Sequence, residues 1–284
     1  MKIIESLSEL RQWRKSLSRE GKSLAFVPTM GNLHTGHIQL VTEAHKHADV
    51  VITSIFVNPM QFGENEDLDA YPRTFKADCE KLEEAGNHIV FYPCVNDMYP
   101  NGLNEQTVVE VPENEHTLCA EATQRPGHFR GVSTVVTKLF NMVQPDVACF
   151  GEKDFQQLRL IKTMVRDLNM PIDIIGVPTV REESGLAKSS RNGYLTTQEK
   201  VKAPALNLAL NVVKQAILAG NINYQELMAQ AKQTIDEAGL KTDYVVIRDA
   251  ISMAPIDDKT QEIVILGAAY LGKARLIDNL SFNR

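Results

Sequence analysis

The chain has 284 residues, of which 43% are hydrophobic and 23% are charged, and these proportions exclude a mostly disordered chain. Lysine and arginine number 30 against 36 acidic residues, a net charge of −6. A protein that binds nucleic acid usually carries a basic excess, so we expect no nucleic-acid partner. The longest strongly apolar run, residues 50–57, is shorter than the roughly 20 residues of a membrane helix. The N-terminal segment is charged throughout and does not resemble a secretory signal, so we expect a cytoplasmic protein without membrane contact.

Four cysteines are present, and none of them forms a CxxC pair. A zinc site is therefore not expected. We predict reduced, mostly buried thiols, as is usual in cytosolic proteins. The four are Cys79, Cys94, Cys119 and Cys149.

Short apolar runs alternate with helical patterns over the first 180 residues. Continuous apolar strands between helices are typical of a parallel sheet that is covered on both faces. We therefore predict an α/β fold, with a Rossmann-like domain over residues 1–180. The predicted strands are 23–27, 50–57, 89–92, 146–150 and 172–177, and the predicted helices are 38–48, 74–85, 132–143 and 155–168.

The pattern changes after about residue 185. Two helical stretches are followed by three strand-like pieces, and this order predicts a smaller α+β domain with an antiparallel sheet over residues 181–284. The predicted helices are 197–219 and 224–238, and the predicted strands are 244–248, 263–268 and 274–277.

Ligands bind at the carboxyl ends of the strands in parallel sheets, so the loops after Val27, Val57 and Phe150 are the places to look for chemistry. The first loop places His34 and His37 at the start of a predicted helix, whose unpaired N–H groups favour an anion. Imidazoles there can bind a phosphate whose charge grows in a transition state. The alternatives are two ordinary histidines near a helix cap, or a metal pair, for which no third ligand is evident.

Two further loops carry cations. Lys153 follows the strand that ends at Phe150, where an ammonium can neutralise phosphate charge. Lys188 and Arg191 flank two hydroxyls, an arrangement that suits a phosphate clamp. Each signal is weak by itself, because charged residues also begin many helices and occupy many exposed loops.

The combination of these loops resembles the nucleotidyltransferase superfamily, which includes the class I aminoacyl-tRNA synthetases. Within it, six blocks in the same order resemble the pantothenate synthetase (pantoate–β-alanine ligase) family, and together they span nearly the whole chain. Lys188 departs from the family's usual Met or Leu at that position. The blocks are PTMGNLHTGH at 28–37, FVNPMQF at 56–62, YPRT at 71–74, RPGHFRGV at 125–132, FGEKDFQQL at 150–158 and SSRNGYL at 189–195.

The resemblance implies a ligase of pantothenate and coenzyme A biosynthesis. Such an enzyme condenses pantoate with β-alanine using ATP, through a pantoyl adenylate, and releases AMP and pyrophosphate. It implies Mg²⁺ as the companion of ATP, with unknown metal ligands, and a homodimer. The alternatives are another nucleotidyltransferase of the His-x-Gly-His type and a catalytically silent nucleotide-binding or scaffold protein.

The resemblance also implies residue roles. His34, His37 and Lys153 are expected to be catalytic through contacts with the triphosphate. Gln61 and Gln157 are expected to bind pantoate, and Gln61 also β-alanine. The expected ATP-binding residues are Met30, Gly31, Asn32, Leu33, His34, Thr35, Gly36, His37, Gly151, Glu152, Lys153, Asp154, Val180, Lys188, Ser189, Ser190 and Arg191.

For some residues in or near these blocks, more than one role fits the sequence. Arg125, His128 and Arg130 could neutralise a carboxylate or pyrophosphate. Asp78 is either an outer contact of magnesium or a helix-surface carboxylate. The histidines that match no block are expected to be surface or structural residues; they are His45, His47, His88 and His116.

Overall fold

The computed structural model describes residues 1–63, 68–112 and 121–284, so Cys119 and His116 lie outside the described residues. The chain divides into two compact units. The first contains the described residues of 1–112 together with 122–152 and 157–178. The second contains, among described residues, Glu121, 153–156 and 179–284.

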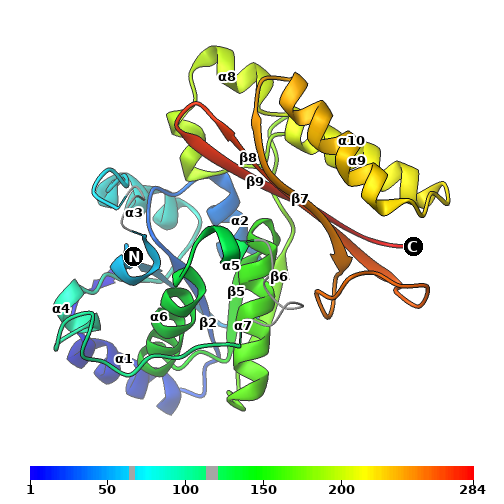
Figure 1. Cartoon of the computed structure of the whole chain (residues 1–284). Coiled ribbons are helices and arrows are strands. Elements are labelled where there is room, and N and C mark those ends of the chain that lie inside the picture. Colours follow the sequence, from blue (N-terminus) through cyan, green and yellow to red (C-terminus); the bar gives the residue numbers. More distant parts are fainter. Residues whose placement is uncertain (64–67, 113–120) are drawn as a thin grey trace. The chain divides into compact units, whose positions relative to one another are not determined.

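The first unit is built on a parallel sheet, as predicted (Figure 1). The sheet has six strands in the order β1-β4-β3-β2-β5-β6. Strands β2 and β3 end level with each other, because Thr29 pairs with Ile55. Only the short edge strand β1 was not predicted, since three residues carry too little pattern. The strands are β1 (Lys2–Ile4), β2 (Leu24–Thr29), β3 (Val50–Ile55), β4 (Ile89–Phe91), β5 (Val147–Gly151) and β6 (Asp173–Val177).

Helices cover both faces of this sheet. On one face Leu40 and Val41 of α2 pack with Val27 in a buried cluster. On the other face Phe140 of α6 contacts the ring of Phe26 edge-on, with 6.2 Å between ring centroids. The helices around the sheet are α1 (Leu7–Arg19), α2 (Thr35–Ala44), α3 (Phe75–Glu84), α4 (Val95–Met98), α5 (Glu121–Gln124), α6 (His128–Val143) and α7 (Phe155–Asp167).

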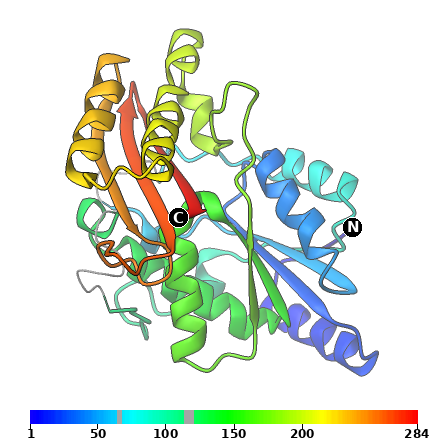
Figure 2. The same ribbon diagram turned by 90° about the vertical axis from the view of Figure 1, so that its right-hand side faces the viewer.

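The second unit contains a three-stranded antiparallel sheet, also as predicted, with α9 and α10 against it (Figure 2). The prediction of one helix over 197–219 is wrong. Pro204 separates α8 from α9, because proline has no N–H to donate to the preceding turn. The elements are α8 (Thr197–Lys202), α9 (Ala205–Leu218), α10 (Tyr224–Glu237), β7 (Lys241–Asp249), β8 (Glu262–Leu271) and β9 (Ala274–Asn283).

Strand β8 is buried on both faces, which explains why it reads as a continuous apolar run. Ile263 and Ile265 belong to the cluster under α9 and α10. Val264 and Leu266 alternate with them and pack with Tyr244 on the opposite face. The three strands are longer than predicted.

The three described cysteines differ in burial. Cys149 is buried and burial raises the pKa of its thiol to about 12, whereas Cys79 is partly buried and Cys94 is exposed. The prediction of mostly buried thiols is therefore wrong for Cys94.

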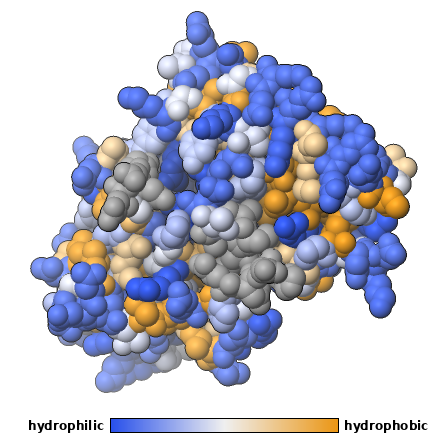
Figure 3. All heavy atoms as spheres, in the orientation of Figure 1, coloured by the Kyte–Doolittle hydropathy of each residue, from blue (hydrophilic) through white to orange (hydrophobic). Residues whose placement is uncertain are grey.

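No helix among the described residues is long and apolar enough to cross a membrane. The face drawn in Figure 3 is mostly hydrophilic, with apolar residues in separate patches.

One glycine allows helix α6 to approach the short 3-10 helix η1 (Pro59–Gln61) closely. A Cβ on Gly131 would lie 2.7 Å from the carbonyl carbon of Met60 and 2.8 Å from the Gln61 nitrogen. Both neighbours are backbone atoms, so they cannot rotate away. Glycine is therefore required at this crossing.

We predict that Gly131→Ala lowers the free energy of unfolding by about 1–3 kcal/mol, because it overpacks this crossing. Denaturant unfolding measures the loss. Gly151→Ala is the matched control, since a Cβ there meets nothing within 4 Å. Equal unfolding curves for the two variants would show that α6 and η1 do not pack this closely.

Candidate functional site

The carboxyl edge of the parallel sheet contains a switch point between β2 and β5. From β2 the chain continues through β3 to β4 on one side, whereas β5 leads to β6 on the other. Ligands of open α/β sheets bind in the crevice at such a point. The loop of residues 30–37 follows β2, and Gly151 and Glu152 come at the end of β5, so the predicted ATP-binding residues of the first unit lie at this edge.

His34 and His37 cap the N-terminus of α2. The His34 Nδ1 accepts from the N–H of Gly36 at 3.1 Å, and the His37 Nδ1 accepts from the N–H of His34 at 3.2 Å. The ring centroids are 4.1 Å apart. An Nδ1 that accepts a hydrogen bond carries no proton, so this geometry assigns the proton of each neutral ring to Nε2. Each imidazole then carries its proton on the nitrogen that does not cap the helix.

A buried carboxylate holds the loop that precedes these histidines. Asp78 of α3 accepts from the N–H groups of Asn32 at 2.9 Å and Leu33 at 2.7 Å. It also accepts from the hydroxyl of Thr74 at 3.0 Å. Asp78 is completely buried, so the alternative of a helix-surface carboxylate is wrong. Asn32 and Leu33 lie 46 and 45 residues away in the chain, and no local pattern could reveal these two partners.

Gln61 is oriented by its neighbours in the first unit. Its Nε2 donates to the sulfur of Met30 at 2.9 Å, and its Oε1 accepts from Asn58 at 3.2 Å. The structure thus brings two predicted site residues together. Tyr99 donates from its hydroxyl to Asn58 at 2.6 Å, and burial raises the pKa of Tyr99, which keeps it a neutral donor.

Asn58 was missed as a site residue. It is buried and caps η1, where its Oδ1 accepts from the N–H of Met60. The sequence contained a usable signal, because asparagine followed by proline is typical of a helix start.

The backbone carbonyl of Gln61 receives a hydrogen bond from the RPGH block. The guanidinium of Arg125 lies 3.0 Å from the His128 Nε2, and the His128 Nδ1 lies 2.8 Å from the Gln61 oxygen. Arginine only donates, so His128 accepts at Nε2 and donates from Nδ1. His128 is thereby assigned as a neutral ring. Arg130 is exposed.

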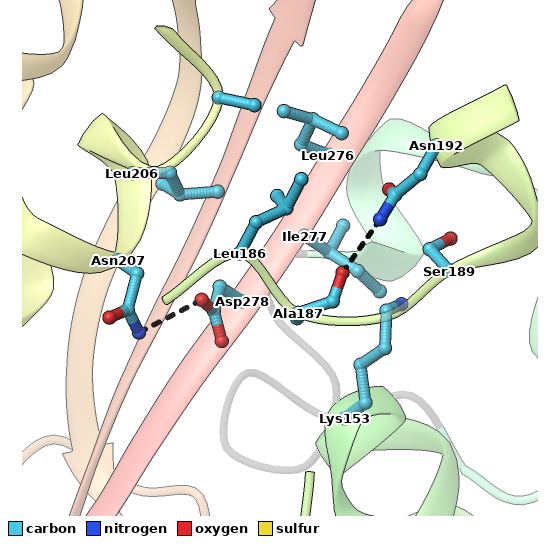
Figure 4. Close-up of a pocket in the computed structure, with 11 residues that line it drawn as sticks. Lys153, Leu186, Ala187, Ser189, Asn192, Leu206, Asn207, Leu276, Ile277 and Asp278 are labelled. Atoms are coloured by element: carbon cyan, nitrogen blue, oxygen red, sulfur yellow. Dashed lines mark hydrogen bonds between the residues drawn. The ribbon is translucent and has the colours of Figure 1, made fainter. Parts of the chain in front are cut away.

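Lys153 of the second unit lines a pocket (Figure 4). The Lys153 ammonium lies 3.7 Å from the carboxylate of Asp154. Asn192 donates to the carbonyl of Ala187 at 3.0 Å, while its buried Oδ1 makes no hydrogen bond with described residues. The lining residues are Lys153, Leu186, Ala187, Ser189, Asn192, Ala203, Leu206, Asn207, Leu276, Ile277 and Asp278.

Lys188 and Arg191 belong to one loop, which we call the basic loop. The segment that leads into it, residues 180–188, turns back on itself like a hairpin. The N–H of Lys188 donates to the carbonyl of Val180 at 2.9 Å. The Lys188 ammonium lies 3.5 Å from the carboxylate of Glu182, across the same segment. This ion pair gives Lys188 a structural partner. The hydroxyl of Ser189 accepts from the N–H of Arg191, and Ser190 begins the 3-10 helix η3 (Ser190–Tyr194).

Asp278 on β9 anchors this segment. Its carboxylate accepts two hydrogen bonds from Arg181, at 2.7 and 2.8 Å, and one from Asn207 at 3.1 Å. The next residue, Asn279, donates to the carbonyl of Lys153 at 2.8 Å. Two adjacent residues of β9 therefore hold the segment that leads into the basic loop and the backbone of Lys153.

Other predicted residues have simpler surroundings. Gln157 is half-buried in the first turn of α7. His47 pairs with Glu43, and His88 accepts from the N–H of Val51, so both have structural partners. No three His, Cys, Asp or Glu side chains within the described ranges are grouped to hold a metal ion.

Known proteins are similar to this chain over nearly its whole length. The profile of the pantoate-beta-alanine ligase family matches residues 2–281. The pantothenate synthetase of Aeromonas hydrophila is 59% identical over 95% of this chain and 93% of that protein. The pantothenate synthetase of Pseudomonas savastanoi pv. phaseolicola is 54% identical over the full length of both chains.

Solved structures show the same fold. The pantothenate synthetase of Thermus thermophilus superposes with a TM-score of 0.91 at 43% identity, covering 99% of both chains. The pantoate-beta-alanine ligase of Francisella tularensis, complexed with beta-gamma ATP and beta-alanine, has a TM-score of 0.81 at 36% identity. It covers 99% of this chain and 97% of that one.

The family model and the relatives make this chain an ATP-dependent ligase, built on an α/β fold. The chain belongs to the pantoate–β-alanine ligase family. It condenses pantoate and β-alanine with ATP, in the biosynthesis of pantothenate. The resemblance seen in the sequence is confirmed, and the two alternative functions are not supported.

The Asp278–Arg181 contact yields a stability prediction. We expect Arg181→Met to lower the free energy of unfolding by about 3 kcal/mol, because it removes the charged partner of a buried carboxylate. Thermal and denaturant unfolding report the change. Lys188→Met is the control, since its ion pair with Glu182 is about one-third exposed and contributes little. Similar stabilities of both variants would contradict the anchoring role of Asp278.

Proposed function

We propose that the reaction proceeds in two steps through pantoyl adenylate. The pantoate carboxylate attacks the α-phosphorus of ATP, the bond to the bridging oxygen breaks, and pyrophosphate leaves. The amine of β-alanine then attacks the acyl carbon, loses a proton, and expels AMP. A carboxylate is a poor electrophile, and this activation supplies a good leaving group. The observation that carries the proposal is the pair of imidazoles of His34 and His37 that cap the start of α2 through Nδ1.

The first step requires charge neutralisation at phosphorus rather than a protein nucleophile. His34 and His37 donate to the triphosphate, aided by the positive end of the α2 dipole. Lys153 and Arg191 supply positive charge to the phosphates. The ATP site of this proposal comprises residues 30–37, Gly151, Glu152, Lys153, Asp154, Val180, Lys188, Ser189, Ser190 and Arg191.

Pantoate contacts are assigned to Gln61 and Gln157, with Gln61 also serving β-alanine. An amide both donates and accepts, which suits a ligand with hydroxyls and a carboxylate. The hydrogen bonds of Asn58 and Met30 to the Gln61 side chain support its assignment, because they limit its rotation.

The Francisella complex supports ATP and β-alanine as ligands of this chain. Mg²⁺ would arrive with ATP and be held chiefly by phosphate oxygens, where it offsets their charge. The Asp78 carboxylate is buried and already accepts three hydrogen bonds, so it does not suit an inner ligand of the metal. We further propose a cytoplasmic homodimer, with residues 1–180 binding nucleotide and pantoate and residues 181–284 acting as a lid.

An assay of AMP formation tests the two-step scheme. We expect AMP release to require ATP, pantoate and β-alanine together. Pantoate alone should support exchange of pyrophosphate into ATP, because the first step is reversible. Exchange that requires β-alanine would contradict a free-standing adenylate step.

Substitution of the phosphate-binding residues should slow the first step. We predict that His37→Ala and Lys153→Ala each reduce pantoate-dependent ATP–pyrophosphate exchange by about 10²–10³-fold, because each removes a positioned donor. His47→Ala and Lys76→Ala are matched controls at exposed positions. Exchange at the wild-type rate in either test variant would remove that residue from the mechanism.

A further inference from the structure

Helix α3 holds the loop that leads into the histidine pair. Asp78 and Lys81 are three residues apart, and such residues lie on one face of a helix. Asp78 accepts from the N–H of Leu33 at 2.7 Å, and the Lys81 ammonium donates to the carbonyl of Leu33 at 2.7 Å. Both polar backbone groups of the residue before His34 are therefore bonded to α3.

The loop between β2 and α2 has an unusual backbone conformation. Gly31 and Asn32 have positive φ angles of 82° and 50°. The successive N–H groups of Asn32 and Leu33 both donate to the Asp78 carboxylate. A single side chain of α3 thus satisfies two backbone donors of the loop.

Gly31 and Leu33 show how tightly the loop fits. A Cβ on Gly31 would lie 3.2 Å from both the Asp78 Oδ2 and the Ile55 side chain, in addition to its unfavourable φ. Leu33 itself is only 2% exposed. The loop can therefore shift little while the Asp78 carboxylate stays in place.

This anchoring reaches the imidazoles through the backbone. The N–H of His34 is the donor that meets the His37 Nδ1, so the direction of that N–H sets the tilt of the His37 ring. The peptide that carries this N–H also contains the carbonyl of Leu33, which Lys81 holds. A rotation of that peptide would break the hydrogen bond to Lys81 and misalign the cap.

We propose that Asp78, assisted by Lys81, is a positioning residue that keeps both histidines in the geometry for phosphate activation. The inference deepens the proposed function and rests on it. Asp78 acts through the backbone and touches no reacting atom. It is required as a carboxylate because three donors converge on it, and an amide would turn an N–H₂ group toward some of them.

The main test compares Asp78→Asn with Glu80→Gln, the same chemical change at an exposed position of α3. We expect Asp78→Asn to lower the maximal rate of pantoate-dependent ATP–pyrophosphate exchange about 100-fold, since misplacement by about 1 Å has this effect. The KM for pantoate should stay within about twofold, because the Gln61 side chain is held by Asn58 and Met30, which lie outside α3. Glu80→Gln should behave like the wild type.

A second readout does not depend on activity. Long-range ¹H–¹⁵N spectra of the imidazoles distinguish the two tautomers of each histidine. In the wild type and in Glu80→Gln we expect unprotonated Nδ1 atoms in His34 and His37. In Asp78→Asn we expect the tautomer preference to be lost. Unchanged spectra would overturn the positioning role.

Lys81→Met provides a milder variant should Asp78→Asn fail to fold, because Lys81 lies at the surface. We expect a reduction of the exchange rate of about tenfold, against no change in Lys76→Met. Wild-type exchange in Lys81→Met would contradict its part in the inference.

The outcomes separate the inference from the function on which it rests. If the wild type shows no pantoate-dependent exchange, the adenylate step is wrong, and the imidazole spectra alone decide the positioning role. If saturating Mg²⁺ restores the maximal rate of Asp78→Asn, Asp78 is a metal contact and the positioning role is wrong.

Discussion

The first backbone N–H groups of α2 have no carbonyl from a preceding helical turn to which they can donate, so other acceptors must satisfy them. This constraint shapes the site. In most helices a serine, threonine or aspartate satisfies such donors. Here the imidazoles of His34 and His37 do so through Nδ1. One local interaction therefore caps the helix, orients two rings and places their protons on Nε2. The requirement of the helix and the requirement of phosphate chemistry are met by the same pair of side chains.

In each unit, buried polar side chains bind the segments that carry the expected reactive groups. In the first unit, Asp78 holds the loop before His34, and Asn58 orients Gln61. In the second unit, Asp278 binds Arg181, and Asn279 binds the backbone of Lys153. Each support is a polar side chain with several donors or acceptors, and each is buried. Such buried groups are ordered because leaving one of their hydrogen bonds unmade is unfavourable.

The predictions from sequence succeeded where the signal is local. The strands near 50–55 and 147–151 are continuous apolar runs, and the His-x-Gly-His element begins a helix as expected. They failed where a neighbour in space decides the outcome. Asp78 reads as a surface carboxylate because α3 is mostly charged, yet it is completely buried. The prediction of one helix over 197–219 failed for a different, local reason, because Pro204 divides the segment and the apolar periodicity concealed this boundary.

The amino-acid sequence by itself determined the parallel sheet, the order of the loops that are expected to bind phosphate, and the family. Periodicity and contiguous motifs are properties of neighbouring residues, so they can be read from the sequence. Tertiary structure alone decided the long-range partners of Asp78, of His128 and of Asp278. The N–H of Asn32 and the carboxylate of Asp78 are 46 residues apart in the chain. Arg181 and Asp278 are 97 residues apart. Pairing at such separations depends on which elements pack together, and no spacing rule within a chain encodes it.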